Sequence, residues 1–527
     1  MHGYSTRENR ETPRTPAAEA AGRLVKAMRR KADMYVLGES DGCVVPTKSS
    51  NNDGTLASAE NSEGRQPTTE NIEQHDLVPD PAPDMGELRG LLGVRKLARQ
   101  DKRMRFTALL HHVTVARLRT SFFALQRGAA PGVDGVTWQA YGTHLETRLV
   151  DLHDRVHRGT YRAQPSKRVY IPKADGRQRP LGIAAVEDKI VQHAVVMVLN
   201  AIYETDFVGF SYGFRPRRSQ HDALDALWMG LMRKRVNWVL DADIRGFFDT
   251  LDHAWLVTFL EHRIADRRVL RLIQKWLRAG VSEDGTWSRT EMGTPQGAVV
   301  SPLLANIYLH YVFDLWVQHW RTHHATGEVI VVRYADDIVM GFEHQHEAEQ
   351  CLAAWHARLQ QFGLALHPDK TRLLEFGRFA ALHRKQRGER KPETFDFLGF
   401  THFCGKTRTN GRFIVQRKTI KKRLRAKLQA VKTELRQRWH DPVPEVGQWL
   451  QRVVQGYFNY HAVPGNGASL ECFRTQIIRQ WFRALRRRSQ RRRINWATFS
   501  RRWVAWIPSV TILHPYPNVR FAAKHPR

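Results

Sequence analysis

The sequence predicts an α+β fold, because long segments with the periodicity of helices alternate with short strands that pair through turns. Two regions carry this prediction. Residues 328–342 consist of two apolar strands on either side of a short acidic turn, and residues 298–316 place large apolar side chains on one helical face. A chain of 527 residues with 42% hydrophobic residues is long enough for several domains with sizeable cores.

Local patterns in the sequence predict individual strands, turns and helices. Residues 167–173 alternate like a strand and lead into a hairpin turn at 174–176, whereas residues 237–243 form an apolar strand that ends in an aspartate. Gly132–Gly135 marks a further turn. Ser219 and Asp222 form a capping box that opens a helix. Helical periodicity predicts helices over residues 105–127, 185–202, 219–231, 298–316, 417–437, 446–460 and 469–486.

Charge is distributed unevenly, and its distribution predicts a polyanionic partner. The formal net charge is +31, and residues 401–527 alone contain 28 basic and four acidic side chains. Such an excess is typical of nucleic-acid binding. Residues 1–90 contain more acidic than basic side chains, and no aromatic residue occurs between Tyr35 and Phe106. We therefore predict that residues 1–90 are a flexible, low-complexity extension.

Several protein classes are not expected from this sequence. A run of about 18 apolar residues, as a membrane span requires, does not occur, and the first residues lack an apolar signal core. The cysteines are widely spaced and form no Cys-x-x-Cys pair: Cys43, Cys351, Cys404 and Cys472. A zinc ribbon or a disulfide framework is therefore not expected, and the sequence favours a reducing cytoplasm.

Three aspartates at strand ends are candidate metal ligands. Asp243 ends the strand at 237–243, and Asp336 and Asp337 lie in the turn between the strands of 328–342. Burial of an unpaired carboxylate is unfavourable, so a positive charge must compensate it. Two magnesium ions meet this requirement, because they prefer carboxylate oxygens and stabilise phosphoryl transfer as a pair. For the Asp336–Asp337 pair alone, an acidic turn exposed to water is the alternative.

The motifs around these aspartates occur in a fixed order. They are Arg179-Pro180-Leu181-Gly182-Ile183, Ser211-Tyr212-Gly213-Phe214-Arg215-Pro216, Asp243 with residues 244–249, Gly293-Thr294-Pro295-Gln296-Gly297, Ser301–Asn306, Tyr334–Asp337, Lys370-Thr371 and Phe395–Phe400. A single such motif is weak evidence, but the ordered set is specific. Over about residues 105–527 it resembles the reverse transcriptases encoded by group II introns.

The resemblance implies a right-hand polymerase fold with fingers and a palm built on an antiparallel sheet. It places an N-terminal extension of the fingers at 91–165 and the fingers and palm at 166–400. A helical thumb that doubles as the maturase domain would span 401–488, and a basic tail that binds DNA or RNA would span 489–527. Basic residues alternate with tryptophans in that tail, a pattern typical of single-strand binding.

The same resemblance assigns the metal ligands and the catalytic groups. Asp243, Asp336 and Asp337 would be catalytic and bind two Mg²⁺ ions, with the Ile244 carbonyl as a further ligand. Lys370 would be the general acid that protonates the leaving pyrophosphate. Because lysines are abundant in this chain, a solvated lysine is the alternative. Asp241, close to Asp243, receives no role.

The resemblance also assigns substrate contacts. Phe248 would pack under the sugar and exclude a 2′-hydroxyl, although core packing is the alternative for this aromatic. Two cations would hold the incoming triphosphate, and three residues would lie beside the nucleotide and template. These are Lys173 and Arg179 for the triphosphate, and Gln296, Gly297 and Tyr334 for the nucleotide and template. A solvated surface is the alternative for the two cations.

The helix at 417–437 carries the predicted RNA-binding residues Lys418, Lys421, Lys422 and Arg425. Few acidic residues lie near these cations in the sequence, so the phosphate groups of a nucleic acid are their expected counter-ions. A helix face exposed to water is the alternative. Intron RNA and a primer–template duplex are both candidate ligands. Relatives with a nuclease module carry paired His and Cys ligands. The sequence lacks such a cluster, so we expect the bacterial type without that module.

The sequence thus predicts an RNA-directed DNA polymerase that copies intron RNA into cDNA by two-metal phosphoryl transfer and assists the splicing and mobility of that intron. Expected partners are the intron RNA, an RNA template with a DNA primer, target DNA and deoxynucleoside triphosphates. The expected location is the bacterial cytoplasm, at the nucleoid when target DNA is bound. A domesticated reverse transcriptase in phage defence or CRISPR adaptation is one alternative, and a non-catalytic splicing chaperone is another.

Overall fold

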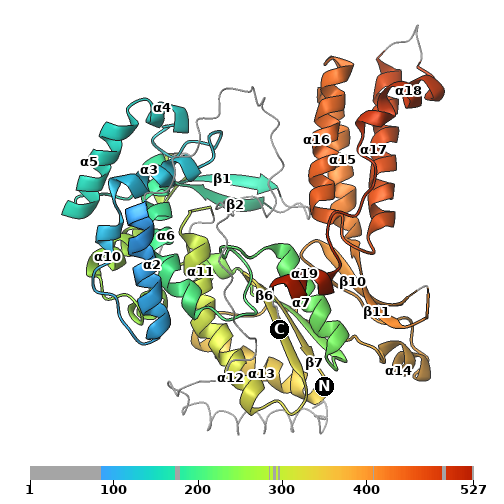
Figure 1. Cartoon of the computed structure of the whole chain (residues 1–527), viewed down its shortest axis with the longest axis horizontal. Helices are drawn as coiled ribbons and strands as arrows, with labels where there is room; N and C mark the ends of the chain where they lie inside the picture. The colour runs from blue at the N-terminus through green and yellow to red at the C-terminus, as the bar shows by residue number, and fades with distance from the viewer. Residues whose placement is uncertain are drawn as a thin grey trace, which may run out of the picture. The chain divides into compact units, whose positions relative to one another are not determined.

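The computed structural model describes residues 85–172, 178–283, 285–288, 292–294, 297–407, 409–488 and 494–524 (Figure 1). Three sheets combine with numerous helices, which confirms the predicted α+β class. Residues 1–84, the hairpin turn at 174–176 and the site candidates Lys173 and Gln296 lie outside the described residues.

A four-stranded antiparallel sheet forms the centre of the fold. Its strands, in spatial order, are β6 (Val329–Tyr334), β7 (Asp337–Phe342), β3 (Trp238–Asp243) and β8 (Arg372–Glu375). Side chains along a strand alternate between the two faces of a sheet. Leu240 and Met340 accordingly lie in one hydrophobic cluster, and Val239 and Val339 lie in another.

Each face of this sheet is covered by a helix. The first cluster contains the apolar side chains of α13 (Gln345–Gln361), and the second contains those of α7 (Gln220–Arg233). Ser219 caps α7 through the predicted capping box with Asp222. The first cluster also includes apolar residues of α9 (His253–Glu261) and α11 (Ser301–Leu309). Both faces of the sheet are therefore buried, which explains its nearly continuous apolar sequence.

A second sheet has the order β2–β1–β4–β5. β1 (Ser166–Pro172) and β2 (Gln178–Ile183) are antiparallel and confirm the predicted hairpin strands. Their partners are β4 (Val281–Glu283) and β5 (Thr286–Ser288). The helices of this part of the chain are α2 (Met85–Gln100), α3 (Val115–Ala124), α4 (Trp138–Gly142), α5 (Leu145–Arg158), α6 (Val186–Asp206), α8 (Phe247–Thr250) and α10 (Arg267–Arg278).

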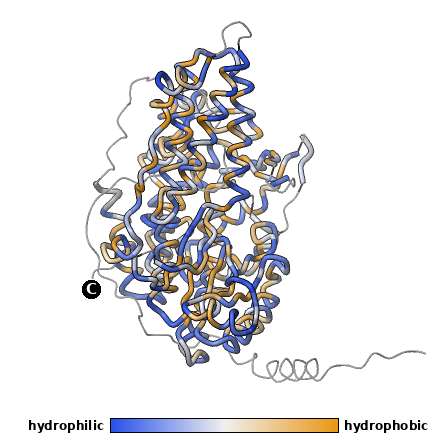
Figure 2. Tube along the Cα trace, turned by 90° about the vertical axis from the view of Figure 1, so that its right-hand side faces the viewer, coloured by the Kyte–Doolittle hydropathy of each residue, from blue (hydrophilic) through white to orange (hydrophobic). Residues whose placement is uncertain are grey.

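A third sheet precedes a helical bundle. Strands β9 (Phe395–Phe397), β10 (Phe400–Lys406) and β11 (Phe413–Thr419) follow α14 (Ala380–Gln386). The bundle helices are α15 (Lys421–Gln437), α16 (Val443–His461) and α17 (Gly467–Arg487), which lie side by side in Figure 1. Their apolar residues form a separate cluster, and hydrophilic and hydrophobic residues alternate along the helices in Figure 2.

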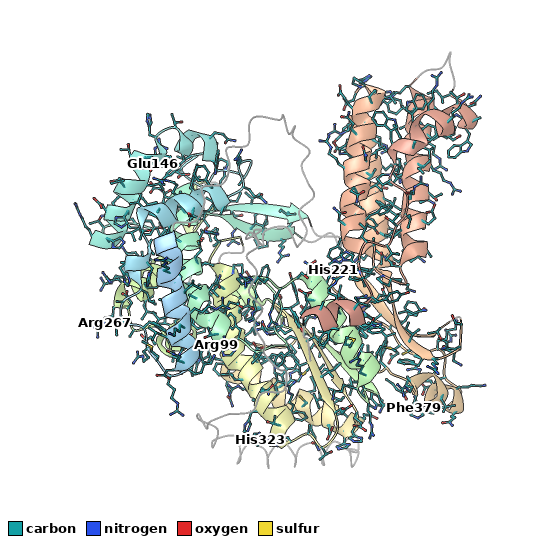
Figure 3. All side chains as sticks on the ribbon, viewed as in Figure 1. Arg99, Glu146, His221, Arg267, His323 and Phe379 are labelled. Atoms are coloured by element: carbon teal, nitrogen blue, oxygen red, sulfur yellow. The ribbon has the colours of Figure 1, made fainter. Side chains whose placement is uncertain are left out.

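The last described segment returns to the central sheet. After α18 (Trp496–Trp503), the helix α19 (Pro517–Lys524) packs on α7. Arg520 of α19 pairs with Asp225 of α7, which also pairs with Arg417 of β11. The His514 and His221 rings lie with their centroids 3.9 Å apart and their planes tilted by 30°; His221 is labelled in Figure 3. Residues from three distant parts of the sequence thus meet at α7.

Several predicted boundaries are wrong. α2 begins at Met85, before the predicted end of the extension at residue 90. The helix predicted at 105–127 is α3 preceded by a 3-10 turn at Leu110–His112, because Thr114 caps α3 by accepting a hydrogen bond from the Arg117 N–H. The predicted helix at 298–316 runs from Ser301 to His323 and contains a π-helical segment, His310–Asp314, between α11 and α12 (Leu315–His323).

The helix predicted at 417–437 begins only at Lys421. Residues 417–419 belong to β11, where Arg417 and Thr419 are buried, so strand pairing with β10 overrides the helical pattern. Within the described ranges, no helix combines the length and apolar character that a membrane span needs.

Candidate active site

The ends of β3 and β7 bring two of the predicted carboxylates opposite each other. The antiparallel register pairs Asp243 with Asp337, and Tyr334 of β6 pairs with Asp337 from the other side. Asp336 lies in the two-residue turn between β6 and β7. Ala335, the other turn residue, has a φ of 54°, a left-handed conformation that is uncommon for a residue with a side chain. The turn thus places both acids at one edge of the sheet.

A neighbouring loop packs closely on this turn. Gly213 lies so near that a Cβ atom added there would approach the Ala335 nitrogen to 2.3 Å. Any larger residue would displace the turn, which explains why glycine occupies this position. The Gly213 carbonyl accepts a hydrogen bond of 2.7 Å from the buried Asn306 amide of α11. The loop and α11 therefore hold the backbone at the acidic turn.

Lys370 contacts the catalytic candidate Asp243 directly. Its Nζ lies 2.5 Å from Asp243 Oδ2, and its side chain is 53% exposed. The segment before Lys370 follows the end of β3, because the His367 N–H donates to the Asp243 carbonyl and Ile244 bridges to Leu366. Ile244 itself is buried. The candidates Asp243, at the end of β3, and Lys370, in the turn before β8, are thus brought together although they are far apart in sequence.

Asp241 lies on the same face of β3 as Asp243, two residues earlier. It pairs with Arg372 of β8 at 3.1 Å. Burial raises the pKa of Asp241 to about 6, an effect that the Arg372 hydrogen bond opposes. An ion pair within the sheet thus accounts for this carboxylate, which received no role from the sequence.

Phe248 lies just after Asp243, on the short helix α8. Its half-buried ring packs against the first hydrophobic cluster, beside the Phe247 ring. The Phe248 carbonyl accepts a hydrogen bond of 2.8 Å from the Thr294 N–H. A Cβ on Gly293, which has a φ of 83°, would approach that carbonyl to 2.7 Å. The residue therefore contacts the glycine-rich segment that precedes α11 as well as the core.

The same segment approaches the second sheet. Gly297 has a φ of 113°, and a Cβ there would lie 2.8 Å from the Gly182 carbonyl of β2. Arg179, on β2, is half-buried and pairs across the hairpin with Ile171. Backbone contacts thus connect the strand that carries Arg179 with the segment next to Phe248. Tyr334 is 4% exposed and belongs to the second cluster, with the Phe214 ring 6.1 Å away.

The donor set at the strand ends suits a hard divalent cation. Asp243, Asp336 and Asp337 offer carboxylate oxygens, which magnesium prefers. The ammonium group of Lys370 on Asp243 shows that a positive charge is accommodated at this carboxylate. Among the described residues, no group of three or more His, Cys, Asp and Glu side chains is close enough to hold an ion. The residue types and their strand register therefore fit a magnesium site, whereas the described side chains do not converge closely enough to enclose an ion.

The predicted RNA-binding residues lie where β11 meets α15. Lys418 is on β11, with its Nζ 5.1 Å from the centroid of the Phe403 ring, and Lys421, Lys422 and Arg425 are on α15. All four are exposed. The first turn of α15 contains no acidic residue, and no side chain caps it.

Sequence reasoning missed a buried charged cluster next to the acidic turn. Arg333 of β6 and Asp314 of the π-helical segment are both fully buried and paired. The sequence does contain a signal for this cluster, because Arg333 and Asp314 are charged residues within apolar segments, and such residues are rarely buried without a partner. The sequence does not show that the two side chains meet.

Comparisons with known proteins agree with this geometry. Residues 171–402 match a family model described as reverse transcriptase (RNA-dependent DNA polymerase). Protein YkfC of Escherichia coli is 36% identical over 325 residues, which cover 53% of this chain and 83% of YkfC. The group II intron-encoded protein LtrA of Lactococcus lactis is 42% identical over 166 residues, 31% of this chain but only 27% of LtrA. Nuclear intron maturase 2 of Arabidopsis thaliana is 25% identical over 236 residues, 37% of this chain and 30% of that protein.

Proposed function

The chain belongs to the family of group II intron-encoded reverse transcriptases and maturases, and from this premise we propose that it is an RNA-directed DNA polymerase that copies intron RNA into cDNA. The observation that carries the proposal is the strand register that sets Asp243 opposite Asp337, with Asp336 in the adjoining turn. Two-metal phosphoryl transfer requires ligands that hold two metal ions close together, and carboxylates at adjacent strand ends can supply such ligands.

The domain layout of the proposal follows from the elements. In this proposal the β6–β7–β3–β8 sheet would be the palm, the β1–β2 hairpin with its helices would be the fingers, and the α15–α17 bundle would be the thumb and maturase domain. In residue ranges, the proposed parts would be the extension up to α2, which begins at Met85, the N-terminal part of the fingers to residue 165, the fingers and palm at 166–400, the thumb at 401–488 and the basic tail at 489–527.

Asp243, Asp336 and Asp337 would hold two magnesium ions, with the Ile244 carbonyl as a further ligand. When bound, these ions would supply positive charge to the attacking and leaving oxygens of the transfer. Lys370 is placed to hold a proton at Nζ, within reach of the same carboxylate edge. Its proton would go to the leaving pyrophosphate oxygen as the bond from that oxygen to phosphorus breaks.

The remaining site residues would bind and select the nucleotide. Arg179, together with Lys173, would bind the triphosphate of the incoming deoxynucleotide. Phe248 would lie under the sugar and exclude a 2′-hydroxyl, in agreement with its fixed position between the core and the Gly293 segment. Gly297 brings that segment against β2, so the nucleotide would bind where the hairpin and the palm approach each other. Gln296 and Tyr334 would complete this contact.

The basic bundle would bind the intron RNA and assist its splicing. Primer–template RNA and DNA, and the target DNA, would use the same positive surface and the basic tail. This part of the proposal places the protein in the bacterial cytoplasm, at the nucleoid when target DNA is bound.

Primer extension on an RNA template tests the polymerase proposal. The purified protein should extend a DNA primer with deoxynucleotides and Mg²⁺. Asp336→Asn should lower the rate by about 100- to 1,000-fold, the range for losing a group that stabilises transition-state charge. Asp369→Asn is the matched control, because Asp369 is an exposed carboxylate that lies outside the four strands of the central sheet and is not among the proposed ligands. Its rate should stay near that of the wild type.

Two other outcomes would contradict the polymerase assignment. Equal extension rates for Asp336→Asn and the wild type would show that the carboxylate edge is not the catalytic centre. An inactive wild-type protein that still accelerates splicing of the intron RNA would instead identify a non-catalytic splicing chaperone.

A further inference from the structure

The carboxylate turn is attached to a buried cluster of polar side chains centred on Arg333. This guanidinium group is fully buried and donates from all three of its nitrogens. Nε and Nη2 donate to the two Asp314 carboxylate oxygens at 2.6 and 2.5 Å. Nη2 also donates to the Ser211 hydroxyl at 2.7 Å, and Nη1 donates to the Asn306 side-chain oxygen at 3.0 Å. A further bond, 3.1 Å long, goes from Nη1 to the Ala335 carbonyl.

The partners of Arg333 come from a helix, a loop and the turn itself. Asn306 and Asp314 are on the helix that begins at Ser301, and Ser211 is on the loop whose Gly213 packs against Ala335. Ala335 is itself in the turn and has the left-handed φ of 54°. A conformation that costs of order 1–3 kcal/mol persists only where its surroundings impose it. Here the guanidinium group on one side and Gly213 on the other impose it.

The π-helical segment has a geometric role in this cluster. Asn306 and Asp314 are eight residues apart, so in a regular helix of 3.6 residues per turn they would point about 80° apart. A π-helical turn contains more residues, so each residue rotates less about the axis. The segment His310–Asp314 lies between the two and removes most of that angle, which allows both side chains to reach one guanidinium group. A π-bulge costs helix stability and is frequent at functional sites.

Stability alone does not account for such a cluster. A fully buried ion pair is often no more stabilising than apolar side chains of the same volume, because both charges lose their hydration. Unlike apolar residues, the cluster fixes an orientation, because five hydrogen bonds hold the Ala335 carbonyl in place relative to the helix and the loop.

We propose that Arg333 and Asp314 are positioning residues that hold the Ala335 turn, and through it Asp336 and Asp337, in the geometry required for catalysis. Asp314 fixes the guanidinium plane, and the guanidinium group fixes the turn. The catalytic part of this inference rests on the proposed polymerase function, whereas the effect on the turn does not depend on it.

The test is the double variant Arg333→Met/Asp314→Leu, which replaces the buried ion pair by apolar side chains of similar volume. It should lose some stability, because Ser211, Asn306 and the Ala335 carbonyl no longer accept a hydrogen bond from Arg333, but less than a variant that leaves one buried charge unpaired. Hydrogen exchange at the amides of Ala335, Asp336 and Asp337 should be at least about tenfold faster. Primer extension at saturating Mg²⁺ should fall by about 100-fold, the cost of a displacement of roughly 1 Å at a reacting group. Half-maximal extension should also require more Mg²⁺, while the affinity for RNA should not change.

The matched control is Arg263→Met/Asp206→Leu, which removes another buried ion pair, 2.9 Å long, that does not contact the turn. It should leave exchange at residues 335–337 unchanged. Ser211→Ala provides a milder second variant that loses one Arg333 contact without removing a charge, and it should raise exchange at the turn to a smaller extent. Rescue of extension by Arg333→Lys should be poor, because an ammonium group cannot reproduce the planar fork.

Unchanged exchange at the turn in either Arg333→Met/Asp314→Leu or Ser211→Ala, relative to the control, would overturn the proposal. Because exchange is measured without metal or nucleic acid, it remains decisive even if the wild-type protein lacks polymerase activity. Failure of the polymerase proposal and failure of this inference are therefore distinguishable.

Discussion

Replacement of Lys418, Lys421, Lys422 and Arg425 by Ala should weaken RNA binding without loss of folding. The four side chains are exposed, and none forms an ion pair with a described acidic residue. Lys427 of the same helix is omitted, because it is half-buried and burial lowers its pKa. Each of the four remaining cations can therefore contact one phosphate.

The magnitude follows from counterion release. Each phosphate contact contributes about 0.9 to the slope of log affinity against log salt on a duplex and about 0.7 on a single strand. Loss of four contacts should lower the slope by about 3–4 on a duplex and correspondingly less on a single strand. As salt rises from about 50 to about 200 mM, the wild-type affinity should fall about 50- to 150-fold more than that of the variant.

The same structure predicts that stability is preserved or raised. Lys421 and Lys422 lie in the first turn of α15, at the positive end of the helix dipole, where no acidic residue or side-chain cap offsets them. Cations there are unfavourable by about 0.3–1 kcal/mol each, so their removal should not lower the free energy of unfolding. Phosphate bound at this position would offset the unfavourable charge.

Filter binding across a salt series measures the slope, and urea unfolding measures the stability. The matched control replaces Arg162, Arg267, Arg271 and Arg278, which are equally exposed and change the net charge by the same amount. An equal fall of the slope in both variants would refute the assignment of this surface, because only the overall charge would then matter. An unchanged slope in the first variant would show that its cations face solvent.

Three further outcomes are expected. Phe248→Ala should incorporate ribonucleotides at least about tenfold better relative to deoxynucleotides, because the alanine methyl group does not fill the space of the phenyl ring. If the variant and the wild type discriminate equally in single-nucleotide incorporation, Phe248 is a core residue only. Lys370→Met should lower kcat by about 100-fold or more with unchanged RNA affinity; an unaltered kcat would restrict Lys370 to its ion pair with Asp243. Burial, reinforced by His514 and Arg520, lowers the pKa of His221 to about 3. Between pH 6.5 and about 3 the unfolded chain protonates His221 and the folded chain does not. The free energy of unfolding therefore falls as the pH is lowered through this range, by at most about 1.4 kcal/mol per pH unit. His221→Gln should make urea unfolding less dependent on pH in this range, and an identical dependence would contradict the reasoning.

Local signals were sufficient for most of the secondary structure. The capping box of Ser219 and the apolar strands on either side of Asp336–Asp337 depend only on neighbouring residues, so the sequence predicts them correctly. The boundary at Lys421 was missed because residues 417–419 pair with β10, a partner that periodicity does not reveal. The π-helical segment was also missed, and its Asp314 pairs with Arg333 of β6, a distant residue that periodicity does not reveal.

The candidate site, too, could be predicted from the sequence only in part. The motifs identify Asp243, Asp336, Asp337 and Lys370 as chemically related, but the register that sets Asp243 opposite Asp337 is a long-range property. Likewise, Arg333 and Asp314 are unusual residues in apolar segments, and only the folded chain shows that each neutralises the other. Which roles these residues perform in catalysis stays a prediction.

The contact between α19 and α7 has a consequence for the order of events during synthesis. Asp225 leaves the ribosome about 290 residues before Arg520, which at about 5–20 residues per second means a delay of roughly 15–60 s. Before Arg520 is made, Asp225 can pair with Arg417, and α7 can already contact Val415 and Tyr460, so α19 is the last of these partners to be made. A nascent chain that begins to fold at the central sheet therefore completes this junction last, after the helices of the bundle have been made.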